Sequence, residues 1–318
     1  MIERLELRNL TVFTGLTLEL SPKINVIIGE NGTGKTHLLK AAYGLCAGAP
    51  LFKNKPDTGD DELEAALTAK LLRLFMPLDD KLGKMHRQGA TDQAYLSARF
   101  TGGQKIAATF FNSLYEKYGL SFDQTYQDIC LLLDLPEVRP ETLHEKSKWA
   151  MAEIEGICGG RFVFYGGGKV TFKTETAEYS ANSMAEGFRK AGILSRLLET
   201  GAIQPGVSGP LFWDEPESNL NPKLMKLLVQ ILLELSRNGQ QIILATHDYV
   251  LLKWFDLLMD KGKDDHVRFH SLYRDADTSE IKVASTEDYL KITPNPIDEA
   301  FGFLINQEIE NDMGGLGK

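Results

Sequence analysis

The chain has 318 residues, and 35 Lys and Arg against 44 Asp and Glu give a formal net charge of −9. Its 43% of hydrophobic and 25% of charged residues are typical of a globular protein. Three scattered cysteines, Cys46, Cys130 and Cys158, exclude a disulfide framework and a zinc knuckle. The first residues do not resemble a secretory signal, and no stretch has the ~18 to 20 apolar residues that span a bilayer. We therefore expect a cytoplasmic protein without a membrane partner, in which any DNA-binding groove is local.

The first part of the chain predicts strands leading into a glycine-rich loop. Apolar and polar residues alternate over 2–8 and 16–20, as in half-buried strands. Residues 24–28, Ile-Asn-Val-Ile-Ile, are typical of a buried central strand. The loop that follows, 29–36, precedes a segment with helical character at 37–46.

The middle of the chain mixes helices and hairpins. Residues 50–62 are polar and broken by Pro and Gly, which predicts a loop. Apolar spacing and strand-like runs around glycine-rich turns predict the remaining elements. These are helices at 62–76, 141–158 and 183–200, and hairpins around the turns at 101–104 and 166–168.

The last part returns to alternating strands and helices. Strands are predicted at 210–214, at 241–246 and near 267–273, and helices at 221–239 and 248–260. Strands separated by helices indicate a parallel α/β core. The final segment, 306–318, is predicted to be frayed.

The glycine-rich loop matches GxxxxGK(S/T), the P-loop pattern. Its glycines let backbone N–H groups turn toward phosphate oxygens, and the next helix presents its positive end to the same anion. Lys35 can reach the β- and γ-phosphates of ATP, and the Thr36 hydroxyl can bind Mg²⁺. The predicted nucleotide-binding residues in this loop are Asn31, Gly32, Thr33, Gly34, Lys35 and Thr36.

Two further strand ends carry polar residues. Leu211-Phe212-Trp213 runs into Asp214 and Glu215, at the edge where open α/β sheets bind ligands. We expect Asp214 to bind Mg²⁺ and Glu215 to act as general base toward water. The strand at 241–246 ends in His247, which could donate a hydrogen bond to phosphate or to the attacking water. We therefore interpret Lys35, Glu215 and His247 as the catalytic set.

Taken in order, these motifs resemble the ABC-type ATPase superfamily, and its soluble branch in particular. That branch includes the RecF, SMC and OLD-like ATPases and the small AAA-family ATPases of bacterial defence systems. Glu215-Pro216-Glu217-Ser218-Asn219-Leu220-Asn221-Pro222 is similar to its EPExxLxP stretch, and Ala245-Thr246-His247-Asp248 to its ATHS switch. The opening residues 5–20 resemble its first hairpin.

The resemblance implies a P-loop NTPase of the ABC-ATPase type, an α/β fold with a parallel core sheet, an antiparallel β subdomain and a mostly helical insert. Because the motifs of one site lie far apart in the chain, we expect a single composite domain over 1–318. Its expected parts are a core lobe at 1–45 and 201–290, an inserted helical and hairpin lobe at 46–200, and a tail at 300–318.

The same family has a signature motif that meets the nucleotide of the opposite subunit. The best match is the segment 182–189, in which Ser183 and Glu186 take the Ser and Glu/Gln positions, while Met184 and Ala185 replace both glycines. The alternative is a helix that Ser183 only caps. A Q-loop glutamine is not assigned, and Gln93 and Gln104 are the nearest candidates.

The resemblance implies an ATPase that uses ATP and Mg²⁺, forms a head-to-tail dimer on ATP binding, and acts in DNA repair or anti-phage defence with a separate effector and possibly with DNA. A rival hypothesis is a scaffold or sensor that binds ATP, hydrolyses it slowly or not at all, and holds a partner toxin or nuclease. A transporter subunit is disfavoured by the missing LSGGQ, and a nuclease by the few residues after His247.

Two other groups of residues invite a functional reading. His266 and His270 lie beside Asp264 and Asp265, which could suggest a metal site, but a strand edge is the simpler interpretation. A second group is basic and could contact phosphate or a partner, but a solvated loop is the favoured interpretation. Its members are Lys81, Lys84, His86 and Arg87.

Overall fold

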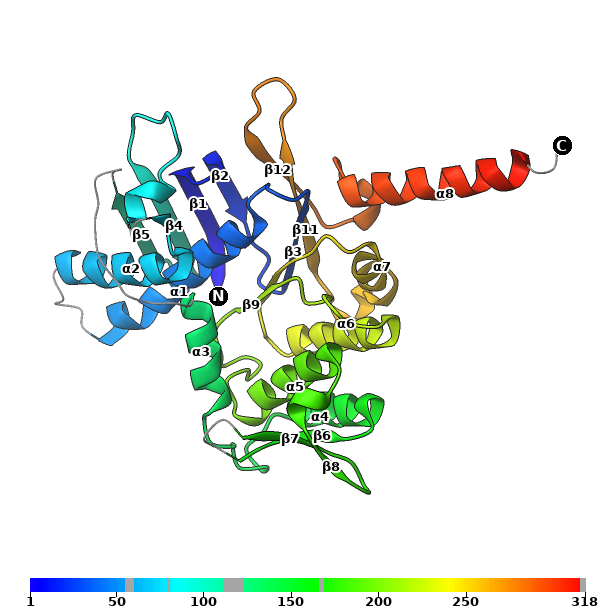
Figure 1. Cartoon of the computed structure of the whole chain (residues 1–318). Coiled ribbons are helices and arrows are strands. Elements are labelled where there is room, and N and C mark those ends of the chain that lie inside the picture. Colours follow the sequence, from blue (N-terminus) through cyan, green and yellow to red (C-terminus); the bar gives the residue numbers. More distant parts are fainter. Residues whose placement is uncertain (55–59, 79–80, 111–122, 166–168, 315–318) are drawn as a thin grey trace.

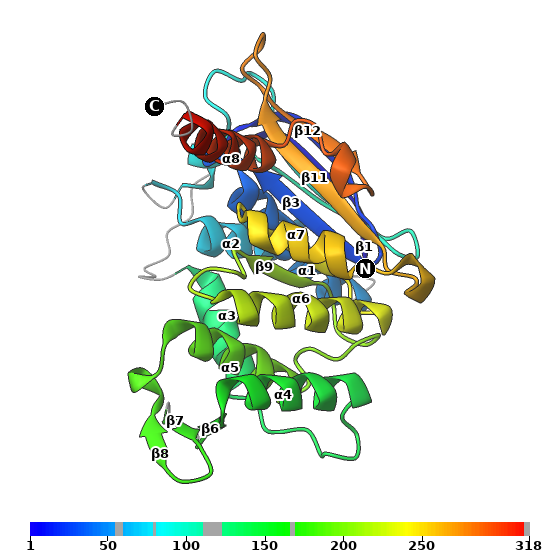
Figure 2. The same ribbon diagram turned by 90° about the vertical axis from the view of Figure 1, so that its right-hand side faces the viewer.

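The computed structural model of the chain describes residues 1–54, 60–78, 81–110, 123–165 and 169–314. Within these ranges the strands form three sheets, and helices cover the central one on both faces (Figures 1 and 2). The predicted P-loop, the acidic pair Asp214 and Glu215, and His247 all lie at or just after the ends of strands of the central sheet.

The first sheet is antiparallel, in the order β2-β1-β4-β5. β1 (Ile2–Leu10) pairs with β2 (Phe13–Glu19) on one side and with β4 (Ala94–Phe100) on the other. β4 and β5 (Lys105–Phe110) form the predicted hairpin, which is confirmed. The sequence assigned this hairpin to the inserted lobe of 46–200, whereas the structure pairs it with β1 in the antiparallel sheet. The reason is burial, because the apolar face of β4 joins the same core as β1.

The central sheet has the order β12-β11-β3-β10-β9. Four of its strands run parallel, which confirms the predicted parallel core. The fifth, β12, lies antiparallel to β11 at the edge. The strands are β3 (Ile24–Gly29), β9 (Leu211–Asp214), β10 (Ile242–Ala245), β11 (Val267–Arg274) and β12 (Ile281–Thr286).

β3 is central because both of its faces are apolar, and all six of its residues are buried. Ile24, Val26 and Ile28 pack into a core shared with the helices on one face of the sheet. Ile27 points to the opposite face, into the core shared with the antiparallel sheet. A run without polar alternation is what a strand covered on both sides requires.

Eight helices surround these sheets in the part of the chain described. α1 and α2 pack with the antiparallel sheet, and α4 to α7 contribute to the core on the other face of β3. The helices are α1 (Lys35–Asn54), α2 (Asp60–Phe75), α3 (Gln124–Leu133), α4 (Glu145–Cys158), α5 (Glu186–Glu199), α6 (Pro222–Arg237), α7 (Tyr249–Leu258) and α8 (Pro296–Gly314).

The helix ends follow the sequence signals closely. The Asn221 side chain accepts a hydrogen bond from the Leu224 N–H at the start of α6, and Pro222 is its first residue. α4 ends at Cys158, where Gly159 adopts the left-handed conformation, with φ of 68°. The helices predicted at 221–239 and 141–158 are therefore confirmed, with slightly narrower bounds.

The third sheet is small and lies beside α4 and α5 (Figure 2). β6 (Arg161–Phe164) and β7 (Val170–Lys173) form the second predicted hairpin, which is confirmed, while its triple-glycine turn lies outside the described residues. β8 (Glu178–Ser180) adds a third strand that the sequence did not predict. The Phe162 and Phe172 rings meet edge to face, with centroids 5.0 Å apart.

Two predictions about irregular segments are wrong. The loop predicted at 50–62 is wrong at both ends, because α1 continues to Asn54 and α2 begins at Asp60, while residues 55–59 lie outside the described residues. The end of the chain was predicted to be frayed from residue 306, but α8 extends to Gly314. Asn295 caps the start of α8, and Phe301 stacks on Tyr249 of α7 at 4.2 Å, which fixes its first turns on the body.

None of the helices in the described ranges combines the length and the apolar character needed to cross a membrane. The boundaries of the core and inserted lobes at residues 46 and 200 stay a prediction. What the structure adds is the pairing of β4 and β5 with the N-terminal strands.

The side chain of Gln241 joins the antiparallel sheet to the central sheet. Its Oε1 accepts from the Ile2 N–H at 2.8 Å, and its Nε2 donates to the carbonyl oxygens of Ile2 and Ser21, both at 2.8 Å. We predict that Gln241→Leu lowers the free energy of unfolding by about 2 to 4 kcal/mol, because three buried backbone groups each lose a hydrogen bond. Urea denaturation measures this loss. Gln307→Ala, on the exposed face of α8, is the control and should cost less than about 0.5 kcal/mol; equal losses would contradict the prediction.

Candidate functional site

The parallel register brings three distant parts of the chain to one edge of the central sheet. Ala245 of β10 lies opposite Ile27 of β3 on one side and opposite Asp214 of β9 on the other. The P-loop after β3, the acidic pair after β9 and the switch after β10 therefore begin side by side. The Glu215 N–H donates to the Ala245 carbonyl at 2.9 Å, which extends this alignment into the site.

The P-loop folds tightly around the Lys35 side chain. Lys35 Nζ donates to the carbonyl oxygens of Gly29, at 2.8 Å, and Glu30, at 3.1 Å, and the side chain is 7% exposed. The Thr33 hydroxyl donates to the Glu30 carbonyl at 2.8 Å. Gly32 and Gly34 have φ of 82° and 93°, which leaves the loop open for an anion in the way that a P-loop requires.

Thr36 and Asp214 meet across the sheet edge. The Thr36 Oγ1 donates to Asp214 Oδ2 at 2.6 Å, and both residues are exposed. A hydroxyl and a carboxylate are hard oxygen ligands of the type that Mg²⁺ prefers. The pair therefore fits the predicted metal site, although 178 residues separate the two in sequence.

Glu215 and His247 also meet. Glu215 Oε1 lies 3.1 Å from His247 Nδ1, and the two side chains are 43% and 51% exposed. Both can therefore reach a ligand from solvent while keeping their mutual contact. A carboxylate in contact with an imidazole can take a proton from water while the ring holds a hydrogen bond to a phosphate oxygen.

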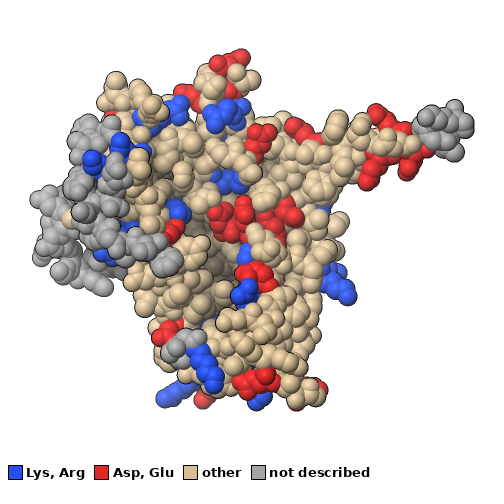
Figure 3. Space-filling view, viewed as in Figure 1, with Lys and Arg blue, Asp and Glu red and all other residues tan. Residues whose placement is uncertain are grey.

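The electrostatics of the edge are dominated by carboxylates. Figure 3 shows an acidic patch in the middle of the face, where β11 and α7 approach each other in Figure 1. Burial lowers the pKa of the Lys35 ammonium, and the negative charges of Asp214, Glu215 and Glu217 oppose that shift. A polyphosphate entering this site meets carboxylates as well as the lysine, so a divalent cation is needed to balance them.

A cavity of about 500 Å³ opens beside the Thr36 and Asp214 pair. It continues between α1 and α3 over mostly apolar side chains, including Phe212 and Ile129. The phosphate-cradling glycines of the P-loop do not line it, so it neighbours the predicted phosphate site rather than forming it.

The two signature-motif residues are exposed and close to the start of α5. Ser183 ends a short 3-10 turn (Ala181–Ser183), and Glu186 is the first residue of α5 and forms an ion pair with Arg189. The helix starts later than predicted, so Ser183 does not cap it; Ala185 holds the cap position without a side-chain bond. Among the described residues, no hydrogen bond or ion pair joins Ser183 or Glu186 to the P-loop of the same chain.

The two glutamines considered for the Q-loop lie at opposite ends of the antiparallel sheet. Gln93 accepts through its carbonyl from Asn9 Nδ2 at 3.4 Å, near the turn that flanks the P-loop. Gln104 lies in the β4–β5 turn at the other end. Neither shares a described hydrogen bond with a predicted site residue.

The basic segment is ordered rather than a solvated loop in its described part. Arg87 Nη1 donates to the Val12 carbonyl at 2.7 Å, and the Thr11 N–H donates to the Met85 carbonyl. The segment therefore buttresses the β1–β2 turn, whose Val12 and Phe13 side chains stand against Gly34.

The histidines near the C-terminal strands are structural. His270 is fully buried between Ser285 and Asn25, and burial lowers its pKa to about 3. His266 contacts Ser21 and Glu287. The strand-edge interpretation is wrong for His270, because β11 lies between β3 and β12. No group of three metal-ligating side chains occurs within the described ranges.

Sequence reasoning gave no role to Glu217 or Lys190. Glu217 is buried and accepts a hydrogen bond from the Thr246 hydroxyl at 2.7 Å, and Lys190 Nζ donates to the Glu215 carbonyl at 3.3 Å. Glu217 could have been noticed as the third acidic residue of the strand-end motif. The Lys190 contact could not, because it depends on how α5 packs against the turn after β9.

Comparisons with known proteins agree with this geometry. One family model, described as "AAA domain, putative AbiEii toxin, Type IV TA system", matches residues 171–253, and another, described as "AAA domain", matches residues 4–105. The curated relatives include the DNA replication and repair protein RecF of Lysinibacillus sphaericus, 42% identical over 62 residues. The RecF protein of Idiomarina loihiensis is 52% identical to this chain over 44 residues. These stretches cover 20% and 14% of this chain, and only 16% and 12% of the two relatives.

Among solved structures, an SMC head bound to the C-terminal winged-helix domain of ScpA aligns with a TM-score of 0.54 at 12% sequence identity. The alignment covers 90% of this chain and 97% of the SMC head, and it establishes the fold. Together, the two AAA-domain models, the partial RecF relatives and the SMC-head fold support a RecF- and SMC-like ABC-type ATPase of the AAA family. This confirms the resemblance and the fold class predicted from the strand-end motifs.

The two P-loop glycines Gly32 and Gly34 differ in the space around them. A Cβ on Gly34 would lie 2.6 Å from Val12 Cγ2 and 2.7 Å from Phe13 Cζ, whereas a Cβ on Gly32 would meet nothing within 4 Å. Both glycines have positive φ, so alanine strains the backbone at either position. We predict that Gly34→Ala lowers the free energy of unfolding by about 2 to 3 kcal/mol and Gly32→Ala by about 1 kcal/mol.

Guanidinium denaturation of the two variants measures this difference directly. Both variants carry the cost of an alanine at positive φ. The difference between their free energies of unfolding therefore measures the clash of Gly34→Ala with the β1–β2 turn. A Gly34→Ala variant as stable as Gly32→Ala would contradict the packing of that turn against the P-loop.

Proposed function

We propose that the chain binds ATP with Mg²⁺ at this sheet edge and hydrolyses the γ-phosphate. The observation that carries the proposal is the contact of 3.1 Å between Glu215 and His247, next to the Thr36–Asp214 pair at 2.6 Å. A general base and a metal pair in adjacent positions are what hydrolysis by water needs.

In this proposal each group has a chemical task. Lys35 leaves its carbonyl partners for the β- and γ-phosphate oxygens, and the P-loop N–H groups, those of residues 31–36, hold the same phosphates. Thr36 and Asp214 would hold Mg²⁺, which would supply positive charge against the developing charge on the phosphate oxygens. Glu215 accepts a proton from water as its oxygen attacks the γ-phosphorus and the bond to ADP breaks. His247 keeps Glu215 in place through Nδ1, and when both ring nitrogens carry a proton its Nε2 donates a hydrogen bond to the γ-phosphate.

The proposal extends to a head-to-tail dimer. Ser183 and Glu186 are exposed, and the start of a helix can offer N–H groups to phosphate, so they suit contact with the nucleotide of a second copy. Dimerisation on ATP binding and release after hydrolysis would make the chain a switch for a separately encoded effector. The names of its matches, RecF and a type IV toxin–antitoxin family, support a cytoplasmic setting in DNA repair or anti-phage defence, with DNA as a possible second ligand.

The scaffold hypothesis is favoured by one observation. Met184 and Ala185 stand where the family signature has glycines, and side chains there obstruct the approach of a phosphate to the backbone. A chain with such a signature could bind ATP and a partner toxin or nuclease while hydrolysing slowly.

Replacing Glu215 separates the two hypotheses. We predict that Glu215→Gln lowers the steady-state rate of phosphate release at least about 100-fold, because the general base is lost. ATP binding persists, and light scattering should detect an ATP-dependent doubling of mass. Glu299→Gln, at the exposed start of α8, is the matched control and keeps the wild-type rate. Wild type and Glu215→Gln that both bind ATP and dimerise without turnover would support the scaffold instead.

Mixing two inactive variants tests whether the sites are shared. Lys35→Ala removes a nucleotide contact and Ser183→Arg blocks the signature, so each variant alone should be inactive. A mixed dimer keeps one intact site, so an equal mixture should recover up to about a quarter of wild-type turnover. Recovery is measured as phosphate release after mixing, with each variant mixed with itself as the control. An inactive mixture that still forms mixed dimers would count against a shared site.

A further inference from the structure

The turn between β9 and α6, residues 215–220, carries one buried carboxylate among exposed ones. Glu217 is 5% exposed, whereas Asp214 and Glu215 before it are open to solvent. Glu217 Oε1 accepts a hydrogen bond from the Thr246 hydroxyl at 2.7 Å. Its other oxygen, Oε2, is buried without a hydrogen-bond partner among the described residues.

The demands of folding do not explain this carboxylate. A buried acidic group with one unpaired oxygen lowers stability, because it has lost water on that side without a replacement. Burial raises the pKa of Glu217, against the effect of the hydrogen bond from Thr246. An apolar residue of similar size would cost less stability at this position, which points to a role for the contact between Glu217 and Thr246.

Thr246 controls the backbone on both sides of His247. Its N–H donates to the Ile27 carbonyl at 3.0 Å, and its hydroxyl accepts from the Asp248 N–H at 3.0 Å. The hydroxyl hydrogen is given to Glu217. Thr246 therefore links the turn that carries Glu215 to the segment that carries His247.

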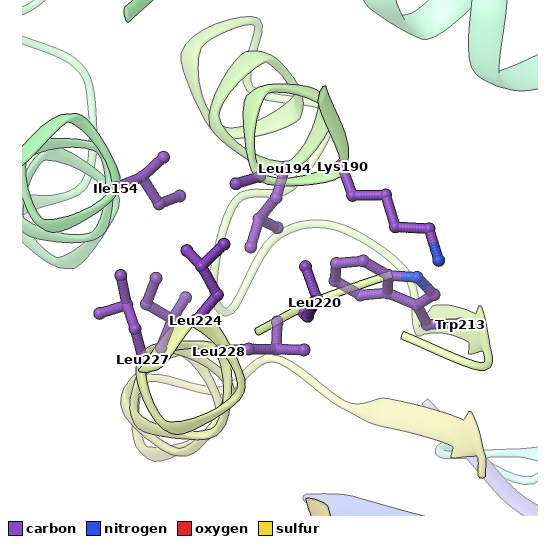
Figure 4. Close-up of a pocket in the computed structure, with 10 residues that line it drawn as sticks. Ile154, Lys190, Leu194, Trp213, Leu220, Leu224, Leu227 and Leu228 are labelled. Atoms are coloured by element: carbon purple, nitrogen blue, oxygen red, sulfur yellow. The ribbon is translucent and has the colours of Figure 1, made fainter. Parts of the chain in front are cut away.

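The opposite side of the turn rests on α5. Lys190 Nζ donates to the Glu215 carbonyl at 3.3 Å, and Figure 4 shows the Lys190 side chain extending beside the Trp213 ring of β9. Gly187 lies so close that a Cβ there would be 2.6 Å from the Asn219 carbonyl oxygen. The turn is thus held between the signature-bearing helix and the end of β10.

We propose that Glu217 is a positioning residue that fastens the 215–220 turn to Thr246 and so sets the contact between Glu215 and His247. Through this turn, the position of α5 acts on the catalytic pair of the same chain. The inference rests on the proposed ATPase function, since its main readout is turnover. It assigns Glu217 no contact with the nucleotide.

Three variants test the proposal through a split between kcat and KM. Glu217→Leu and Thr246→Val each break the hydrogen bond while keeping side-chain size. We expect each to lower kcat about 10- to 100-fold with KM changed less than about threefold. The double variant should be no slower than the worse single variant, because both substitutions remove the same hydrogen bond between Glu217 and Thr246. Glu217→Gln keeps an acceptor for Thr246 and should recover kcat to within about threefold of wild type.

Thr286→Val, outside the site in β12, is the control for the Thr246 change. Thermal unfolding of each variant shows whether it is folded at the assay temperature. An unchanged kcat in folded Glu217→Leu or Thr246→Val would overturn the proposal. Equal losses of kcat in Glu217→Gln and Glu217→Leu would also overturn it, because they would point to the charge of Glu217 rather than to its hydrogen bond.

A second measurement does not depend on turnover. If wild type fails to hydrolyse ATP, the proposed function fails, and the ring signals of His247 in NMR spectra then decide this inference. Glu217→Leu should shift these signals, and Glu217→Gln and Thr286→Val should leave them close to wild type. Identical His247 signals in all variants would show that Glu217 does not set the catalytic pair.

Discussion

Parallel hydrogen bonding between β3, β10 and β9 is the constraint on which the rest of this protein depends. Ala245 lies opposite both Ile27 and Asp214, so the chain must leave all three strands at the same edge. Lys35, Thr36, Asp214, Glu215 and His247 all lie at or just after the ends of these strands at that edge. A shift of the register between β10 and either neighbour would separate Glu215 from His247 and Thr36 from Asp214.

Two cores hold this register in place. Alternate side chains of β3 point into opposite cores, one shared with the antiparallel sheet and the other with the helices α4 to α7. Gln241 ties the two sheets together through the backbone of Ile2 and Ser21. The β1–β2 turn reaches the P-loop at Gly34, so the antiparallel sheet also shapes the nucleotide-binding loop.

The acidic edge and the buried lysine explain why the proposed chemistry requires a cation. Lys35 is held by backbone carbonyls and surrounded by three carboxylates, and the patch in Figure 3 extends this negative charge over the surface. Mg²⁺ at Thr36 and Asp214 would offset part of it when a nucleotide enters. The path from α5 through the 215–220 turn to Thr246 gives the signature helix a physical route to the catalytic pair.

The sequence by itself determined the fold class, the P-loop, the acidic strand end and the role predicted for His247, because each rests on local pattern. These patterns are the apolar run at 24–28, the glycine spacing in 29–36, and the apolar runs that end in polar residues. Local pattern also predicted both hairpins. It could not place the β4–β5 hairpin beside β1, extend α8 to Gly314, or find the roles of Glu217 and Lys190. These features depend on which surfaces meet after folding, and such long-range contacts leave no periodic trace in the chain.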